Sequence, residues 1–249
     1  MLKKLILISC LWLSSCEAQM FETFKRIDED VPIKVLHSRT DDNFGTVLLM
    51  HGCAGENPHN AYWSEQFAKQ GFNAVLIDSW TYHNVPWNYA CKNFVDPRIR
   101  LKELYITASW VRKQSWHKGG VFLAGYSHGG VAAVQASKRP ISDGIDKIVA
   151  YYPYCLKSDH TVPPQVPIQV HIGTADDWTP AERCKGLYQD VAIGEYFEYE
   201  GAYHNFDNPG QDTKVMANGT GGSLSWRTVK YHQPSSDLAF KRVLDFFKR

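Results

Sequence analysis

Residues 120–130 read GVFLAGYSHGG, an apolar run that ends in the pattern Gly-x-Ser-x-Gly. The apolar part predicts a strand buried on both faces, and residues 127–137 predict a helix directly after it. At such a turn the chain bends sharply and lifts the serine hydroxyl above the edge of the sheet. Although the pattern also occurs in ordinary glycine-rich turns, its place between a strand and a helix makes Ser127 the candidate nucleophile.

Apolar runs alternate with helical patterns along the rest of the chain. We expect strands at residues 32–38, 46–51, 72–78, 147–152, 167–172 and 195–200, and helices at residues 60–69, 96–114, 179–189 and 235–248. Residues 201–234 are polar and glycine-rich, so we expect a long loop there. The alternation predicts an α/β fold with a mostly parallel, doubly wound sheet and helices on both faces. Ligands of such sheets bind beyond the carboxyl ends of the strands.

A serine nucleophile requires a histidine base that is oriented by a carboxylate. In the α/β-hydrolase fold the acid and then the histidine follow the nucleophile, in loops after later strands. Asp176 and His204 occupy such positions. Two alternatives stay open: Asp177 as the acid, with Asp176 capping a helix, and His232 as the base.

Acyl transfer also needs hydrogen-bond donors for the oxyanion of the tetrahedral intermediate. The backbone N–H of His128, directly after the nucleophile, is one candidate donor. The second should lie in the loop after an early buried strand, which reads His51-Gly52-Cys53-Ala54-Gly55. We expect Cys53 N–H to be this donor, although the segment could also be a plain turn.

Aromatic side chains gather in the loops that should flank the nucleophile. Trp80, Tyr82 and Trp87 follow one strand, and Tyr154 follows another. We expect these four to line a pocket for an apolar group or a sugar. The alternative is that they only pack beneath a long loop.

The chain of 249 residues has 27 basic and 26 acidic residues, so its net charge of +1 gives no field that would gather nucleic acid. Residues 1–18 resemble a secretory signal, with two lysines, a short apolar run and the sequence Leu13-Ser14-Ser15-Cys16. Cys16 is the candidate lipidation site, and cleavage after Ala18 is the alternative. We expect residues 19–249 to form a single domain in the bacterial cell envelope, either lipid-anchored or periplasmic, or to be secreted.

Export affects how the cysteines are interpreted. Besides Cys10 and Cys16 in the signal, four cysteines remain, and none of their spacings is typical of a zinc site. In an oxidising compartment four cysteines favour two disulfides. Loops that follow neighbouring strands can meet at the same end of the sheet, which favours the pairs Cys53–Cys91 and Cys155–Cys184. The alternative is four free buried thiols.

Taken together, these segments resemble the dienelactone hydrolase family of α/β-hydrolases. The matching pieces lie between about residues 45 and 248, and they are residues 51–55, 125–129, 151–153, 173–180 and 201–206. The resemblance implies a single domain without a cofactor or metal, Ser127, Asp176 and His204 as the triad, and Cys53 and His128 as the oxyanion hole.

Three departures from that family set this chain apart. The dienelactone enzymes proper use a cysteine nucleophile, where this chain has Ser127. They place a glutamate where Gly52 stands, and an arginine near the position of Asn208. We therefore expect a serine hydrolase for a small-molecule ester or lactone, with membrane contact only through a lipid anchor. The alternatives are a serine peptidase or a non-catalytic envelope lipoprotein that keeps the fold.

Overall fold

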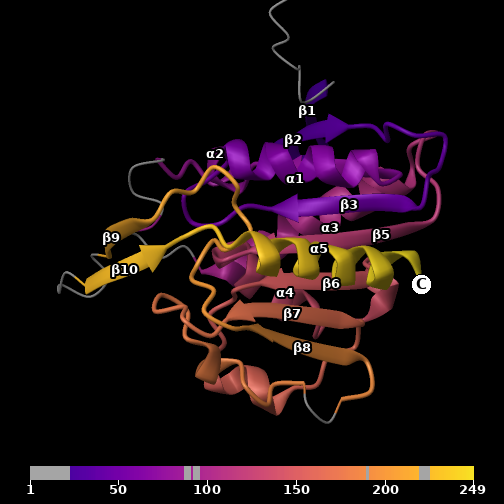
Figure 1. The fold of residues 1–249 in the computed structure, drawn as a ribbon. Coiled ribbons are helices and arrows are strands. Elements are labelled where there is room, and N and C mark those ends of the chain that lie inside the picture. The colour runs from indigo at the N-terminus through magenta and orange to yellow at the C-terminus, as the bar shows by residue number, and fades with distance from the viewer. Residues whose placement is uncertain (1–22, 87–90, 92–95, 189–190, 219–224) are drawn as a thin grey trace, which may run out of the picture.

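The computed structural model of this chain describes residues 23–86, 91, 96–188, 191–218 and 225–249. The expected signal at residues 1–18 with its candidate lipidation site Cys16, and Trp87, which is expected to line a pocket, therefore lie outside the described residues. An eight-stranded sheet forms the centre of the molecule, with helices packed on both of its faces (Figure 1). The doubly wound α/β-hydrolase fold expected from the sequence is confirmed.

The order of the strands places the nucleophile strand in the middle of the sheet. In spatial order the strands are β1 (Thr23–Ile27), β2 (Val31–Leu36), β4 (Phe72–Ile77), β3 (Gly45–Met50), β5 (Gly120–Tyr126), β6 (Lys147–Tyr151), β7 (Ile168–Gly173) and β8 (Gly194–Tyr199). β2 is antiparallel to both of its neighbours, and the pairs from β4 through β8 are parallel. The loops after β3, β5, β6, β7 and β8 therefore meet at one edge of the sheet.

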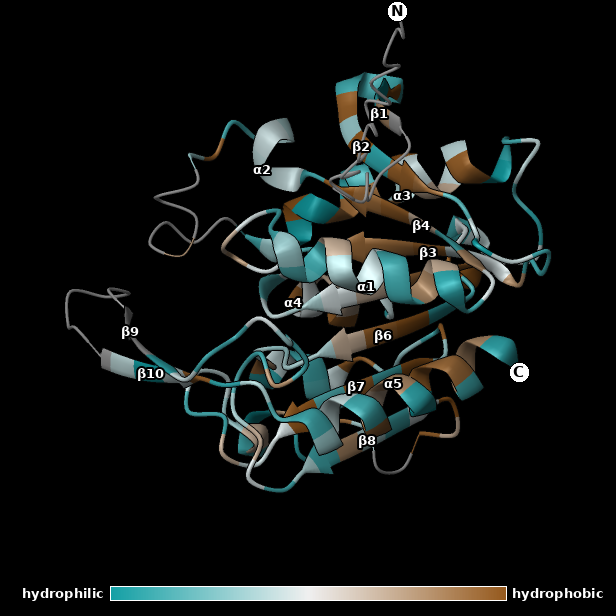
Figure 2. Ribbon diagram, turned by 45° about the horizontal axis from the view of Figure 1, so that its top comes forward, coloured by the Kyte–Doolittle hydropathy of each residue, from teal (hydrophilic) through white to brown (hydrophobic). Residues whose placement is uncertain are grey.

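The central strands are apolar because both of their faces are covered. Every residue of β3, β4 and β7 is buried. Figure 2 shows brown strands between helices whose outer faces carry teal, hydrophilic residues. Burial on both faces is the cause of the continuous apolar runs in the sequence.

Two pairs of helices cover the two faces of the sheet. α1 (Pro58–Lys69) and α5 (Gln233–Lys248) share one face, where Trp63 of α1 packs against Phe240 of α5 with ring centroids 4.8 Å apart. α3 (Arg100–Arg112) and α4 (His128–Ala136) share the other face, where Tyr105 OH donates to Ala136 O. A short helix, α2 (Ser79–Tyr82), follows β4. Within the described part of the chain, no helix combines the length and apolar character needed to cross a bilayer.

The helix expected at residues 179–189 is not formed, and this prediction was wrong. Only the short 3-10 helix Ala181–Arg183 is present in the described part of that segment. Pro180 precedes it, Gly186 adopts a left-handed φ of 79°, and Cys184 is tied to Cys155 by a disulfide. Pro180 only marks where the helical turn begins, whereas the left-handed conformation of Gly186 ends the helical backbone after that turn.

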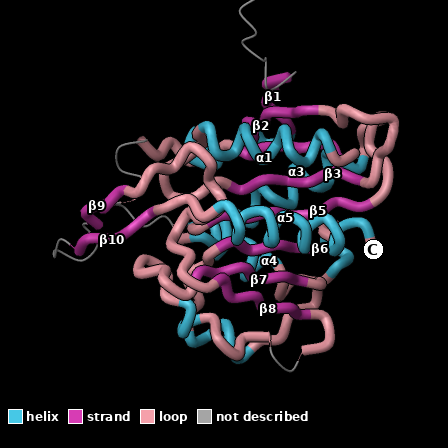
Figure 3. The backbone as a smooth tube through the Cα atoms, viewed as in Figure 1, coloured by secondary structure: helices cyan, strands magenta, loops and turns pink. Residues whose placement is uncertain are grey.

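The long loop expected at residues 201–234 contains a hairpin that the sequence analysis missed. β9 (Lys214–Asn218) pairs antiparallel with β10 (Ser225–Val229). The pair projects beyond the edge of the sheet at which β3 ends (Figures 1 and 3). The dipeptide Asn218-Gly219 at the end of β9 is the turn signal that could have indicated it. β1 was also not expected.

Candidate active site

The chain turns sharply at Ser127, between β5 and α4. Ser127 has φ 53° and ψ −112°, a strained conformation for a residue with a side chain. The turn is possible because its neighbours are glycines: a Cβ on Gly125 would lie 2.2 Å from Gly129 O, and one on Gly129 would lie 2.1 Å from Met50 O. Ser127 N donates to Tyr151 O on β6 at 3.0 Å, which fixes the turn against the sheet.

A chain of hydrogen bonds joins Ser127 to two residues from distant loops. Ser127 Oγ lies 3.0 Å from His204 Nε2, and His204 Nδ1 lies 2.8 Å from Asp176 Oδ2. A carboxylate accepts only, so Nδ1 carries the proton and Nε2 is left to accept from the serine hydroxyl. This is the geometry of a nucleophile, a general base and an orienting acid.

Asp176 is held by its own loop, residues 174–180, which we call the β7 loop. Its Oδ1 accepts from the backbone N–H groups of Trp178 and Thr179 at 2.9 and 2.8 Å, and its Oδ2 accepts from Thr179 Oγ1 at 2.8 Å. Asp176 is 4% exposed and His204 is 2% exposed. The carboxylate is therefore shielded from water and fully hydrogen-bonded, which fixes its orientation toward the imidazole.

The two alternative residues have other partners. Asp177 Oδ1 accepts from Thr228 N at 2.9 Å and so attaches β10 to the β7 loop. His232 is the residue before α5, and its Nδ1 lies 2.7 Å from Ser235 Oγ. The structure brings Asp176 and His204 to Ser127, whereas Asp177 attaches a distant hairpin strand and His232 bonds within the start of α5.

A second buried polar group lies beneath His204 and was missed by the sequence analysis. The ring of Tyr152 packs against that of His204 with centroids 4.6 Å apart. Tyr152 OH donates to Asp207 Oδ1 at 2.8 Å, and Asp207 Oδ2 lies 3.0 Å from His59 Nε2 at the start of α1. Burial, and next the charge of Asp207, raise the pKa of Tyr152, which therefore stays a neutral hydrogen-bond donor. No local pattern links these three residues, because 55 positions separate Tyr152 from Asp207.

The loop after β3, residues 51–57, lies directly beside Ser127, and we call it the β3 loop. A Cβ on Gly52 would lie 3.4 Å from Ser127 Cβ, so the two segments are in close contact. Gly55 N donates to Gly52 O at 3.2 Å, which closes a tight turn around Cys53. The turn places the backbone of Cys53 at the same sheet edge as Ser127 and His128.

The four aromatic residues expected to line a pocket have different environments. Trp80 is 4% exposed, and its Nε1 donates to Cys53 O at 2.9 Å, so it supports the β3 loop and presents almost no surface to a ligand. Tyr82 and Tyr154 are partly buried, and the guanidinium of Arg183 lies 4.2 Å from the ring centroid of Tyr154. Trp178, whose ring centroid is 5.1 Å from that of His204, is a further partly buried aromatic residue at the site.

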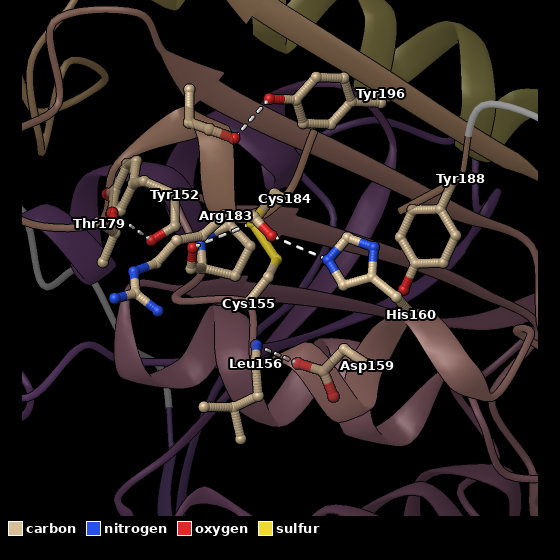
Figure 4. The surroundings of a disulfide bond; sticks show 12 residues. Tyr152, Cys155, Leu156, Asp159, His160, Thr179, Arg183, Cys184, Tyr188 and Tyr196 are labelled. Carbon is tan, nitrogen blue, oxygen red and sulfur yellow. Dashed lines mark hydrogen bonds between the residues drawn. A yellow bond between two sulfur atoms is a disulfide. The ribbon is translucent and has the colours of Figure 1, made fainter. Parts of the chain in front are cut away.

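Two disulfides join the pairs of cysteines that the sequence analysis expected. Cys53 is bonded to Cys91, with Cα atoms 4.9 Å apart. Cys155 is bonded to Cys184, with Cα atoms 5.1 Å apart (Figure 4). The first attaches the β3 loop to the segment after α2, and the second joins the segment after β6 to the one after the β7 loop. Among the described residues, no cluster of three His, Cys, Asp or Glu side chains could hold a metal ion.

Comparisons with known proteins agree with this architecture. The sequence profile of the dienelactone hydrolase family matches residues 33–249. A comparison with curated proteins finds no match.

Solved structures resemble this chain over most of their length. A dienelactone hydrolase-like promiscuous phosphotriesterase from metagenomic libraries is 15% identical with a TM-score of 0.62, over 87% of this chain and 91% of that chain. An esterase from the Planctomycetes species Thermogutta terrifontis is 17% identical with a TM-score of 0.62, over 92% and 96%. An α/β serine hydrolase without a lid from Xanthomonas campestris is 17% identical with a TM-score of 0.57, over 73% and 84%. At these identities the likeness establishes the fold alone.

Proposed function

The chain belongs to the dienelactone hydrolase family, and on this basis we propose that it is a serine hydrolase that cleaves a carboxylic ester or lactone of a small molecule. The observation that carries the proposal is the hydrogen-bond chain from Ser127 Oγ through His204 to Asp176, with distances of 3.0 and 2.8 Å. Ser127 also replaces the cysteine nucleophile of the dienelactone enzymes proper.

The proposed reaction begins with attack of Ser127 Oγ on the carbonyl carbon of the ester. His204 Nε2 takes the hydroxyl proton, and Asp176 stabilises the imidazolium that forms. The backbone N–H groups of Cys53 and His128 donate hydrogen bonds to the former carbonyl oxygen and stabilise its negative charge. The C–O bond to the alcohol then breaks, and His204 returns the proton to the leaving oxygen.

Water completes the proposed cycle. With the alcohol released, His204 takes a proton from water, and the hydroxide attacks the acyl-enzyme carbonyl. A second tetrahedral intermediate collapses to the carboxylic acid and free Ser127, which regains its proton from His204. A lactone follows the same steps, except that its alcohol stays attached to the acyl group.

A fluorophosphonate probe tests the nucleophile directly. The wild-type protein should be labelled at Ser127, and the Ser127→Ala variant should show no labelling above background. Hydrolysis of p-nitrophenyl esters should fall by about 10⁴-fold or more in Ser127→Ala and in His204→Ala, and by little more in the double variant, because these residues act as a unit. Equal labelling of wild type and Ser127→Ala would refute the proposal, and cleavage of peptide anilides without ester cleavage would favour a peptidase.

We also propose that the protein works outside the cytoplasm. Its two disulfides are typical of proteins from an oxidising compartment. Lipidation at Cys16, as expected from the sequence, would anchor the protein to a membrane. In that case Cys16→Ala should shift the protein from the membrane fraction to the soluble fraction, and unchanged partitioning would contradict the anchor.

A further inference from the structure

A fully buried arginine lies behind the β3 loop, outside the triad. Arg100, the first residue of α3, is 0% exposed. Its Nη1 donates to His51 O at 2.9 Å and to His128 Nδ1 at 3.0 Å, and its Nε donates to Ser79 Oγ at 3.0 Å. One guanidinium nitrogen thus bonds both to the start of the β3 loop and to the residue after Ser127.

We propose that Arg100 is a positioning residue that fixes the two oxyanion-hole donors, Cys53 N–H and His128 N–H, relative to each other. The inference rests on the proposed function, since it assigns a role within that same site. His51 O lies two residues before Cys53, and the His128 side chain belongs to the second donor residue itself. A bond to both sets the spacing between two segments that are 75 positions apart in the sequence.

Sheet hydrogen bonds do not reach far enough to set this spacing. The paired register of β3 and β5 ends at Met50 opposite Gly125. Beyond that point the ladder hydrogen bonds stop, although the β3 loop and the turn at Ser127 stay in van der Waals contact, with a Cβ on Gly52 3.4 Å from Ser127 Cβ. The guanidinium of Arg100 joins the two chains where the sheet no longer does.

Trp80 limits the movement of the guanidinium and of both of its partners. The Arg100 guanidinium lies 5.0 Å from the Trp80 ring centroid. The rings of His51 and His128 pack against Trp80 with centroids 5.1 and 5.3 Å away. Because the Trp80 indole also donates to Cys53 O, the same ring contacts both the β3 loop and His128.

Arg100 keeps its charge at this depth. Burial lowers the pKa of Arg100 to about 10, so the guanidinium remains protonated near neutral pH. Glu103 provides a buried counter-charge, with Oε1 3.9 Å from Arg100 Nε, and its Oε2 lies 3.0 Å from His83 Nε2. Since arginine only donates, His128 Nδ1 must be unprotonated to accept from it.

The environment of Arg100 is not arranged for maximum stability. Within the described residues, Arg100 Nη2 and Glu103 Oε1 are buried without a hydrogen-bond partner. A buried ion pair with unsatisfied atoms contributes little net stability compared with an apolar pair of similar size. A role in positioning the donors accounts for the charged residue, whereas a role in packing does not.

The test compares Arg100→Lys and the double variant Arg100→Met/Glu103→Gln, which leaves no unpaired buried charge. Lysine keeps the positive charge but lacks the rigid planar fork through which Arg100 holds Ser79 Oγ, His51 O and His128 Nδ1 at the same time. With p-nitrophenyl acetate as substrate, we expect kcat to fall about 10²-fold in both variants while KM changes less than threefold. The affinity for a trifluoromethyl ketone, which forms an oxyanion on Ser127, should fall by the same factor as kcat/KM.

Arg112→Met is the matched control. Arg112 lies on the same helix, and its guanidinium also binds a loop carbonyl, Gly144 O, at 3.1 Å. Arg112 has no contact with the β3 loop. The kcat of the Arg112→Met variant and its affinity for the trifluoromethyl ketone should therefore equal those of the wild type. Glu103→Gln alone separates the effect of the lost counter-charge from that of the lost guanidinium.

Three outcomes are distinguishable. A trifluoromethyl ketone affinity that stays at the wild-type value in Arg100→Lys overturns the positioning role, whatever happens to thermal stability. A crystal structure of Arg100→Lys gives a readout that needs no activity, and an unchanged separation of Cys53 N and His128 N would overturn the role equally. Failure of the wild type to react with esters and with a fluorophosphonate would instead refute the proposed function.

Discussion

The β3 loop and the β7 loop lie on opposite sides of Ser127 and are held in different ways. The β7 loop fixes its carboxylate with its own atoms, since Trp178 and Thr179 are two and three positions from Asp176. The β3 loop depends on residues far away in the sequence. Arg100 is 49 positions from His51, while Trp80 and Cys91 are 27 and 38 positions from Cys53.

Within one site, the β7 loop is therefore held by contacts between residues close in sequence, and the β3 loop by contacts between residues far apart in sequence. A short stretch of sequence is sufficient to orient Asp176, so the acid should tolerate changes elsewhere in the molecule. The β3 loop needs three long-range contacts to be formed correctly before its backbone can serve as an oxyanion donor. Substitutions that affect the two loops should therefore have different effects. Those within the β7 loop should act on the base His204 through Asp176, and those at residues remote from the β3 loop should act on the donor Cys53 N–H.

The largest expected effect comes from the acid itself. Asp176→Asn should lower kcat by about 10⁴-fold, because an amide stabilises the wrong imidazole tautomer and no imidazolium. Asp177→Asn is the matched control on the neighbouring residue. Its oxygen can still accept from Thr228 N, so kcat should stay within about threefold of the wild type. Steady-state kinetics with p-nitrophenyl acetate measure both, and equal losses would mean that the β7 loop does not separate the two roles.

Next in size is the loss of either disulfide. Loop-closure entropy predicts a decrease in unfolding free energy of about 3.6 kcal/mol for Cys155→Ala/Cys184→Ala and about 3.9 kcal/mol for Cys53→Ala/Cys91→Ala, from the 29 and 38 positions that separate the pairs. Their effects on kcat should differ. We expect about a tenfold loss in the second variant, whose β3 loop is released, and less than a threefold loss in the first.

Urea unfolding and kinetics under strongly native conditions check the disulfide prediction. The comparison of the two loops would be wrong if both variants lost kcat to the same extent. It would also be wrong if the Cys53→Ala/Cys91→Ala variant kept full activity, because the loop would then be fixed without that contact.

The smallest expected effect is a dependence of stability on pH. Burial, and next the charge of Arg100, lower the pKa of His51, the first residue of the β3 loop. Burial, and next the charge of Arg242, lower the pKa of His171 on β7 to about 3. As pH falls below 6.5, the unfolded chain binds protons at these positions and the folded protein does not. The unfolding free energy should therefore fall with decreasing pH, by at most about 1.4 kcal/mol per unit for each histidine.

The variant His171→Gln tests this slope. Urea unfolding at pH 7, 6 and 5 should give a flatter dependence in His171→Gln than in the wild type. The control is His160→Gln at an exposed position, which should leave the slope unchanged. An identical slope in wild type and His171→Gln would show that β7 does not contribute to the acid sensitivity.

The sequence was informative where the determinants are local. The apolar strands, the turn at Ser127 and the loops after β7 and β8 each have a short pattern, so the fold and the order Ser127, Asp176, His204 could be predicted. The disulfide pairs followed from the adjacency of β3 with β4 and of β6 with β7. The helix expected at residues 179–189 failed because the helical pattern gave no sign of the left-handed conformation of Gly186.

Other features of the site depend on contacts that no short pattern describes. Arg100 reads as an ordinary surface residue at a helix start, and its burial arises only when α2 and the β3 loop cover it. The Tyr152–Asp207–His59 group likewise joins three separate elements. Trp80 was assigned to the pocket because its position in a loop gave no information about the carbonyl that its indole binds.

The β9–β10 hairpin gives the protein a place where its sequence can be exchanged as a module. The two ends of the hairpin lie side by side, since Lys214 and Val229 are paired residues. Val229 also pairs with His204, and Lys230 N donates to His204 O at 3.1 Å. Hairpins of other lengths and compositions could be grafted between Lys214 and Val229. Such grafts would give a combinatorial library of surfaces beside His204, while the sheet and the Ser127 turn stay constant.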